Sequence, residues 1–346
     1  MEEKKVAVIV PRLYFGGLTR VAIELLKRLE KVNGLNFTIF TTRIKSKWHE
    51  ELETEVNKFS PVPYPDLVFH RPDIKSKLDD YDLIFNHNLY VNKLSRLLKT
   101  PMLSVNHTLH SYETRWFYRG LGIKYKLQKR LNQIGARNLQ YADRVVCISD
   151  NIRKRTSDIY KARSTRIYHG GNLEFLEPSN TDNNFIFAPD NIGSSIERIS
   201  KEKRVKGLGN FQNSKIEGIG VVSDEKLSDY YKKCSFIVSG SFSDGFGLSA
   251  VEAAFCGKPC VVRSIGGYRE TVKHGETGFL AENSYEFHKY VDKLWNNPEL
   301  RKEMGRNAYE HVKDRFTWEN AAKKYLVEMN DLMGTDFELP EEVMDG

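Results

Sequence analysis

Residues 236–262 read FIVSGSFSDGFGLSAVEAAFCGKPCVV, in which an apolar strand, a glycine-rich loop, a helix and a second apolar strand follow one another. The triplet Phe236–Val238 and the run Pro259–Val262 are typical of buried strands, and Ser249–Cys256 between them is typical of a buried helix. Strands that alternate with helices form βαβ units, whose strands are parallel. This stretch therefore predicts an α/β fold built on a parallel sheet.

The same alternation extends over the whole chain in two halves. In the first half we expect strands at Val6–Val10, Phe37–Thr41, Leu83–Phe85, Met102–Val105 and Arg144–Ile148, and helices at Thr19–Leu29, Val91–Leu98, Lys124–Asn138 and Asn151–Ile159. In the second half we add strands at Phe185–Ala188 and Ile216–Val222, and helices at Asp224–Lys233, Tyr285–Trp295, Pro298–Arg315 and Trp318–Met333. The segment HGGNLEFLEP at 169–178 interrupts the pattern and predicts a hinge. Two α/β halves predict a ligand cleft at the carboxyl ends of their strands.

The composition narrows the class of protein. With 346 residues, 40% hydrophobic and 29% charged, the chain is neither disordered, collagen-like nor stapled by disulfides, and its length is that of about two domains. Its four cysteines show neither CxxC pairs nor zinc spacing with histidine, so we expect buried thiols in a reducing compartment. The first apolar run, VAVIV, is too short for a signal sequence or a membrane span. We therefore expect a cytoplasmic protein.

The glycine-rich loop Asp244–Leu248 carries the clearest chemical signal. Backbone amides at the start of the helix that follows can hold a diphosphate, while Asp244 and Glu252 can accept hydrogen bonds from hydroxyl groups. A sugar nucleotide presents both kinds of group. The alternative is structural: Ser249 and Glu252 have the S-x-x-E spacing of a capping box, in which the glutamate accepts a hydrogen bond from a backbone amide. A second pair, Gly266-Gly267, could form a simple turn.

A shorter signal lies after the first strand, where Gly16-Gly17 leads into a helix. Free amides there could receive an anion, but a plain turn between strand and helix has the same pattern. The spacing is not GxGxxG, so it gives little support to a dinucleotide site.

Together, the motifs of this chain resemble those of retaining, GT-B-fold glycosyltransferases of glycosyltransferase family 4. The stretch from 235 to 280 is similar to the family's PSxxEGFGLPxxEAMACGxPVV, SxxGGxxE and GxTGxL, and FTWENAA from 316 is similar to its closing FSWExxA helix. Gly16-Gly17 with TRVA, His107 after MLSV, ADRVVCIS, and HGGNLEFLEP at the family's hinge complete the set. The resemblance implies two Rossmann-like domains facing across a cleft: an acceptor domain of residues 1–170 to which the closing helix at 318–346 crosses back, and a donor domain of residues 171–317.

The resemblance also implies roles for individual residues. Glu252 would bind the ribose hydroxyls of the nucleotide. Asp244, where the family usually has glutamate, would bind hydroxyls of the donor sugar, and His107 would lie at the reacting anomeric centre; these two are the candidate catalytic residues. A histidine after a strand is also typical of a packed turn residue, and only the resemblance favours His107 over His110, His87 and His169. The other implied donor-binding positions are Gly16, Gly17, Phe246, Gly247 and Leu248. No metal or other cofactor is implied, because helix amides and basic side chains can stabilise the leaving diphosphate.

One family feature is irregular in this chain. The family places an arginine and a lysine, in a pattern like GRxxxxKG after the first strand of the second domain, on the donor diphosphate. The nearest counterpart here is ERISKEKRVKG, which offers Arg198 and Lys203, or Lys206 in place of Lys203. A solvated basic helix is the structural alternative.

The formal net charge of +7 is concentrated in one segment. Between Arg115 and Arg137 the chain carries seven basic residues and no acidic one, so the remainder of the chain is neutral. We interpret the segment as a surface for an anionic acceptor or membrane, where each lysine or arginine adds about 1 kcal/mol. An ordinary amphipathic surface helix is the alternative. The candidate residues are Arg115, Trp116, Arg119, Lys124, Lys126, Lys129 and Arg130.

The expected function is transfer of a hexose from a nucleoside diphosphate sugar to an acceptor hydroxyl with retention of configuration. A glycan or lipid-linked acceptor is favoured by the basic aromatic segment, which also predicts peripheral contact with an anionic membrane. Two alternatives stay open: glycosylation of modified DNA, since the same basic patch could follow phosphates, and a non-catalytic protein of this fold that binds a sugar nucleotide or glycan. Nucleic acid is the less favoured partner.

Overall fold

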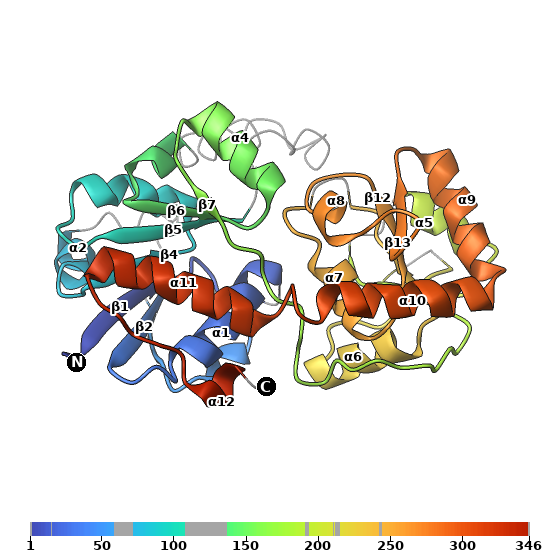
Figure 1. The fold of residues 1–346 in the computed structure, drawn as a ribbon, viewed down its shortest axis with the longest axis horizontal. Coiled ribbons are helices and arrows are strands. Elements are labelled where there is room, and N and C mark those ends of the chain that lie inside the picture. Colours follow the sequence, from blue (N-terminus) through green and yellow to red (C-terminus); the bar gives the residue numbers. More distant parts are fainter. Residues whose placement is uncertain are drawn as a thin grey trace. The chain divides into compact units, whose positions relative to one another are not determined.

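The chain folds into two compact α/β units (Figure 1). The computed structural model describes residues 2–14, 16–58, 72–107, 137–190, 194–209, 211, 215–241 and 244–344. The first unit contains residues up to Tyr168 together with the C-terminal segment from Trp318, and the second runs from His169 to Thr317. The segment HGGNLEFLEP, in which we expect a hinge, begins at the boundary between the units.

Among the described residues, the first unit contains a seven-stranded parallel sheet in the order β3-β2-β1-β4-β5-β6-β7. The apolar run of the first strand, residues 6–9, is completely buried, as expected for a central parallel strand with both faces covered. The order changes direction between β1 and β4, and ligands of such sheets bind at that point, beyond the carboxyl ends of the strands. The strands are β1 (Lys4–Ile9), β2 (Leu35–Thr41), β3 (Glu55–Lys58), β4 (Leu83–Asn86), β5 (Met102–Asn106), β6 (Arg144–Cys147) and β7 (Thr165–Arg166).

The helices of the first unit largely follow the apolar spacing of the sequence. One prediction needs correction: the helix expected at Val91–Leu98 is a 3-10 helix, η3, that spans Leu89–Arg96, which suits the three-residue spacing of its buried Val91 and Leu94. The predicted helix Lys124–Asn138 falls almost wholly outside the described residues. The helical segments of this unit are α1 (Gly17–Leu29), η1 (Trp48–Glu51), α2 (Pro72–Leu78), η3 (Leu89–Arg96), η4 (Asn138–Tyr141), α4 (Asp150–Tyr160), α11 (Trp318–Met333) and α12 (Glu341–Met344).

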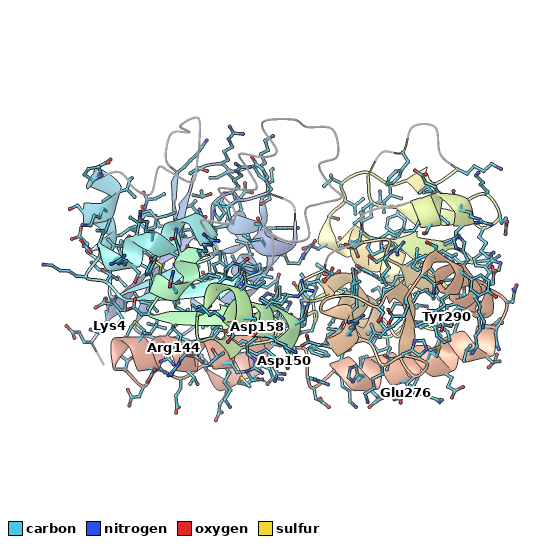
Figure 2. The ribbon with its side chains drawn as sticks, turned by 90° about the horizontal axis from the view of Figure 1, so that it is seen from above. Lys4, Arg144, Asp150, Asp158, Glu276 and Tyr290 are labelled. Carbon is cyan, nitrogen blue, oxygen red and sulfur yellow. The ribbon has the colours of Figure 1, made fainter. Side chains whose placement is uncertain are left out.

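The closing helix α11, drawn in red in Figure 1, packs against α1 of the first unit, so the C-terminal segment does return to the N-terminal part of the chain. Arg28 of α1 joins the two helices: its guanidinium lies 2.7 Å from Glu319 of α11 and 2.7 Å from Glu24. Arg144, labelled in Figure 2, pairs with Glu328 and Asp331 further along α11. The Arg28 pairs are largely buried, and removing one partner of a buried ion pair leaves uncompensated charge, so these pairs help to fix where α11 docks.

Within the described residues, the second unit contains a six-stranded parallel sheet in the order β10-β9-β8-β11-β12-β13. Its change of direction lies between β8 and β11. The predicted strand Ile216–Val222 shrinks to the exposed edge strand β10, because glycines at 218 and 220 follow its start and Gly220 adopts a positive φ. The strands are β8 (Ile186–Ala188), β9 (Val205–Gly207), β10 (Glu217–Gly218), β11 (Phe236–Val238), β12 (Cys260–Arg263) and β13 (Gly278–Ala281).

Local capping explains where the longer helices of the second unit begin. The side chains of Ser223, Asn283 and Asn297 each accept a hydrogen bond from a backbone amide in the first turn of the helix that follows, and Pro298 begins its helix. The helices of this unit are α5 (Ser194–Ile199), α6 (Asp224–Lys233), α7 (Leu248–Phe255), α8 (Tyr268–Thr271), α9 (Ser284–Trp295) and α10 (Pro298–Val312). In the described part of the chain no helix is both long enough and apolar enough to cross a bilayer.

Candidate functional site

The loop from Asp244 to Leu248 follows β11 at the point where the second sheet changes direction. Its shape is set by Asp244, whose carboxylate accepts a hydrogen bond from the amide of Phe246 at 2.9 Å. Gly247 then caps α7 with a φ of 93°, in the left-handed region. A Cβ on Gly247 would lie 2.8 Å from the ring of Tyr268, so both the conformation and the space require glycine.

The second glycine pair, Gly266-Gly267, packs against the backbone of this loop. A Cβ on Gly266 would overlap the carbonyl of Asp244, and one on Gly267 would overlap the backbone of Phe246. The amide of Gly267 donates to that Asp244 carbonyl at 3.2 Å. The pair is therefore more than a turn, because it allows two loops that are distant in sequence to pack backbone against backbone.

Glu252 does not take part in a capping box, so that structural alternative is wrong. The N-cap of α7 is Gly247, and Ser249 lies inside the first turn with its hydroxyl directed to Asp190. The buried carboxylate of Glu252 accepts a hydrogen bond from the hydroxyl of Tyr231 on α6 at 2.7 Å. Burial, and then the charge of Glu252, raise the pKa of Tyr231 well above its usual value, so the phenol stays a donor.

Asp190 is a member of this cluster that the sequence analysis missed. It follows β8 after one residue, and its carboxylate accepts hydrogen bonds from Ser249 at 2.5 Å and from Tyr268 at 3.1 Å. Burial and the charge of Asp190 together raise the pKa of Asp244 to about 7. The available signal was a carboxylate two positions after the predicted strand Phe185–Ala188.

The structure does not bring the predicted phosphate-binding cations to the α7 loop. Arg198 and Lys203 line a hollow of about 290 Å³ formed with α9, where the Lys203 ammonium lies 2.6 Å from Asp292. The alternative, Lys206, lies on β9 and pairs with Glu217 of β10 at 2.7 Å. A basic helix was also only partly right, since α5 ends at Ile199 and Lys206 belongs to a strand. Their ion pairs direct both lysines to neighbouring elements of the unit.

In the first unit, His107 follows β5 and lies next to His87, which follows β4. The Nδ1 of His87 and the Nε2 of His107 are 2.9 Å apart, and the two rings stack with centroids 5.1 Å apart. One of these nitrogens must donate and the other accept, so each ring restricts the tautomer of the other. His107 is therefore one half of a histidine pair, and His87 is its partner from the neighbouring strand.

A buried polar network holds the strand ends that carry these histidines. The side-chain amide of Asn86 donates to Asn92 at 2.8 Å and to Ser104 at 2.9 Å, and its oxygen accepts from the amide of Asn88 at 2.9 Å. A fully satisfied buried network of this kind rigidifies its surroundings. It fixes the backbone on both sides of His87.

The glycine turn after β1 lies at the direction change of the first sheet. Gly16 is the N-cap of α1, and its backbone is extended, with a φ of 166°. A Cβ on Gly16 would meet no atom within 4 Å, so nothing in the fold itself requires glycine there. Open space over free helix amides suits close approach of a ligand to the backbone. Gly17 begins the helix.

The remaining predicted residues lie in the basic segment, and positions 108–136 fall outside the described residues. Arg115, Trp116, Arg119, Lys124, Lys126, Lys129 and Arg130 all belong to that stretch. In the described ranges, no three histidine, cysteine, aspartate or glutamate side chains gather closely enough to hold a metal ion.

Two family models match the chain and together include most of it. Residues 15–175 match the model described as "Glycosyltransferase Family 4", and residues 192–311 match "Glycosyl transferases group 1". An uncharacterised glycosyltransferase of Methanocaldococcus jannaschii is 27% identical over 94% of this chain and 99% of that protein. Trehalose synthase of Pyrococcus horikoshii is 34% identical, but the match spans 40% of this chain and 32% of that enzyme.

Solved structures of glycosyltransferases share the fold. Sucrose-phosphate synthase of Thermosynechococcus elongatus superposes with a TM-score of 0.78 at 18% identity, over 96% of this chain and all of that one. The HepE protein of Anabaena in complex with UDP-glucose also gives 0.78, at 17% identity over 95% of this chain and all of that one. At such identities the likeness shows a common fold.

Proposed function

Because the chain is a GT-B glycosyltransferase of the family 4 type, we propose that it transfers a hexose from a nucleoside diphosphate sugar to an acceptor hydroxyl with retention of anomeric configuration. The proposal rests mainly on the start of α7. There the Phe246–Leu248 loop leads into the helix turn that carries Glu252, at the point where the second sheet changes direction. The first amides of α7, which follow the Phe246 amide held by Asp244, suit the diphosphate, and the Glu252 carboxylate suits the ribose hydroxyls.

In the proposed reaction the bond between the anomeric carbon and the diphosphate oxygen breaks, and the acceptor oxygen bonds to that carbon from the same face. The acceptor proton leaves with the nucleoside diphosphate or passes to solvent. His107, whose orientation His87 supports, would hold the donor sugar. The loop amides and the α7 dipole would stabilise the charge that develops on the leaving group. We propose no resident metal for this chemistry.

Our proposals for the donor and the acceptor rest on the ligand of a structural neighbour and on the charge of the basic segment. The Anabaena neighbour is described in complex with UDP-glucose, which makes a UDP-sugar the first donor to examine. We propose a glycan or lipid-linked acceptor that approaches the first unit, where the basic segment at 115–137 provides positive charge for an anionic membrane surface. Asp190 near the proposed diphosphate position favours one second candidate, a sugar-nucleotide-binding protein without turnover.

The test incubates the protein with labelled UDP-, GDP- and ADP-sugars in the presence of membrane lipid extract. We expect transfer from one donor, and nuclear magnetic resonance of the product should show the donor's anomeric configuration. Donor binding without transfer or hydrolysis would favour the second candidate. Absence of binding for every donor would refute both.

Glu252→Gln tests the site itself. The amide can still accept from Tyr231, so the fold should be kept, whereas the charge that binds ribose hydroxyls is lost. We expect nucleotide affinity to fall by at least about tenfold, since hydrogen bonds to charged groups contribute about 1.5–3 kcal/mol. Glu299→Gln, an exposed change on α10, is the matched control and should leave affinity unchanged. Unchanged affinity in Glu252→Gln would remove Glu252 from the site.

A further inference from the structure

Four basic side chains lie beyond the carboxyl ends of β1 and β2 in the first unit. They are Arg12, Arg43, Lys45 and Lys47, all of them exposed, and we call them the basic row. Arg12 follows β1, and the other three follow β2. Ligands of parallel sheets bind at this edge, beyond the carboxyl ends of the strands.

Backbone hydrogen bonds hold the two loops of the basic row side by side. The amide of Leu13 donates to the carbonyl of Arg43 at 2.8 Å, and the amide of Lys45 donates to the carbonyl of Leu13 at 2.8 Å. A parallel bridge also joins Leu13 and Ile44. The pairing of β1 with β2 therefore continues past the ends of both strands.

The side chains of residues 42–47 alternate between the interior and the solvent. Thr42 and Ser46 are buried and Ile44 is half-buried, whereas the three basic residues at the odd positions are exposed. In an extended segment, side chains two positions apart share a face. The three cations that follow β2 are thus displayed on one side, and the other side anchors the segment.

The loop that carries Arg12 is fixed to the start of α1. The hydroxyl of Thr19, in the first turn of α1, accepts a hydrogen bond from the amide of Tyr14 at 3.1 Å and donates one to the carbonyl of Arg12 at 3.2 Å. The Lys45 ammonium lies 5.5 Å from the centre of the Tyr14 ring. The cations of the row are therefore mounted on an ordered backbone.

The charge of the basic row is not compensated within the described ranges. There, no ion pair joins any of its four side chains to a carboxylate. The acidic residues that follow it in sequence are Glu50 and Glu51, and Glu51 pairs with Lys27 of α1 at 2.5 Å. The chain also leads from the row to Gly16, the open N-cap of α1. An anion that approaches this edge is attracted by the cations of the row.

The histidine pair lies at the same edge of the sheet. His87 follows β4, His107 follows β5, and the strand order is β2-β1-β4-β5. Neighbouring strands are about 4.8 Å apart, so β1 and β2 lie about 10 and 14 Å from β5. One acceptor molecule with its anionic group remote from its reacting hydroxyl can span this distance.

We propose that the basic row binds a phosphate group of the acceptor, so that the acceptor is a phosphorylated sugar or a lipid-linked sugar phosphate whose reacting hydroxyl lies near His107. This inference rests on the proposed function and names the class of its acceptor. Arginine binds phosphate through two parallel N–H bonds and lysine binds it as a point charge. The row holds the phosphate in place, and no bond to that phosphate forms or breaks during transfer.

Two probes distinguish the sources of the phosphate. Inorganic phosphate, titrated by calorimetry with and without saturating UDP, represents a soluble acceptor. Vesicles of one part phosphatidic acid to four parts phosphatidylcholine, compared with phosphatidylcholine alone in a sedimentation assay, represent a lipid acceptor. The variant Arg43→Gln/Lys45→Gln removes two exposed cations and leaves the inward side chains in place. We expect it to bind one of the probes at least about tenfold less tightly than wild type, because charge-assisted hydrogen bonds are lost.

Two further proteins serve as controls. Lys31→Gln/Lys154→Gln removes the same charge from exposed positions elsewhere in the first unit, Lys31 before β2 and Lys154 on α4, and should bind both probes as wild type does. Arg43→Lys/Lys45→Arg exchanges the two side chains and keeps both charges, so it should retain most of the affinity. Its binding also shows that substitution at these positions is compatible with the fold.

Transfer assays connect this phosphate site with the acceptor. With the membrane lipid extract as acceptor, Arg43→Gln/Lys45→Gln should raise the acceptor KM by about tenfold and leave the donor KM unchanged, since the row contacts only the acceptor. Inorganic phosphate should compete with the acceptor in wild type and lose this effect in the variant.

Three outcomes would overturn the inference. The first is that wild type binds neither probe, or binds both no more tightly than Arg43→Gln/Lys45→Gln does. The second is an equal loss in Lys31→Gln/Lys154→Gln, which would show attraction by net charge alone. The third is a raised donor KM with an unchanged acceptor KM. Phosphate binding by a wild-type protein that uses no donor would instead refute the proposed function, and with it the acceptor role, while keeping the row as an anion site.

Discussion

Replacing Asp244 by asparagine should make the folded protein less sensitive to alkaline pH. The perturbation is small, because the asparagine oxygen can accept the same hydrogen bond from the Phe246 amide. What changes is that the side chain at position 244 can no longer gain or lose a proton. Burial and the nearby Asp190 raise the pKa of Asp244 in the folded protein to about 7, from an ordinary value of 3.8. Between these two values the unfolded chain releases the proton and the folded protein keeps it.

The sign and size follow from linkage. A carboxyl whose pKa is raised by folding contributes stability that is complete below the unfolded value and is lost as pH rises toward the folded value. The full loss corresponds to about 4 kcal/mol, since one pKa unit equals about 1.4 kcal/mol. Between pH 5 and pH 8 the wild-type free energy of unfolding should fall by about 2 to 3 kcal/mol relative to Asp244→Asn.

The assay is urea unfolding of both proteins at pH 5, 6, 7 and 8, followed by circular dichroism. Other titrating groups act equally in both proteins, so the difference between them isolates Asp244. A difference that stays constant over this range would show that Asp244 titrates at its ordinary pKa, and one that grows with the opposite sign would show that the folded protein stabilises the carboxylate.

Three other changes have separate expected outcomes. His87→Phe removes the hydrogen-bond partner of His107 and should lower kcat by about tenfold with little change in the donor KM; His87→Asn should restore part of the loss, and equal rates in all three proteins would dismiss the pair. Arg28→Ala removes the guanidinium that Glu24 and Glu319 share between α1 and α11, although Glu24 keeps its ion pair with Lys27, and should lower the free energy of unfolding by about 3 kcal/mol, against less than about 0.5 kcal/mol for the exposed control Lys302→Ala. Lys203→Ala should change UDP affinity by less than about twofold, because an ion pair holds this lysine against α9; a larger loss would return it to the donor site.

The local sequence pattern was sufficient to predict the bounds of several helices and strands. Helices α6 and α11 and strand β11 begin and end where the sequence predicts. Amphipathic spacing and serine caps are short-range properties, so the sequence carries them directly. The short strands β3 and β9 were missed, because a few residues at or near a sheet edge need no apolar run. Their strand conformation depends on pairing with a neighbour.

In the candidate site, too, some residues could be predicted from the local sequence and others could not. The glycine loop and Glu252 were found from their spacing, and the structure places both at the start of α7. The partners of these residues were not found. Tyr231 comes from α6 and Asp190 from the end of β8, each far from Glu252 and Ser249 in sequence, and no local pattern reports a hydrogen bond across such a separation.

By itself, the sequence determined the α/β class, the places where glycine-rich loops follow strands, and the family's order of motifs, because these depend on conformational preference and short spacing. Only the tertiary structure decided which charges meet. In it Lys203 forms an ion pair with Asp292, Ser249 donates a hydrogen bond to Asp190 and is not part of a capping box, and His87 is hydrogen-bonded to His107. The physical reason is that Coulomb and hydrogen-bond energies depend on distances of a few ångströms, and sheet order sets those distances between residues that the sequence keeps far apart.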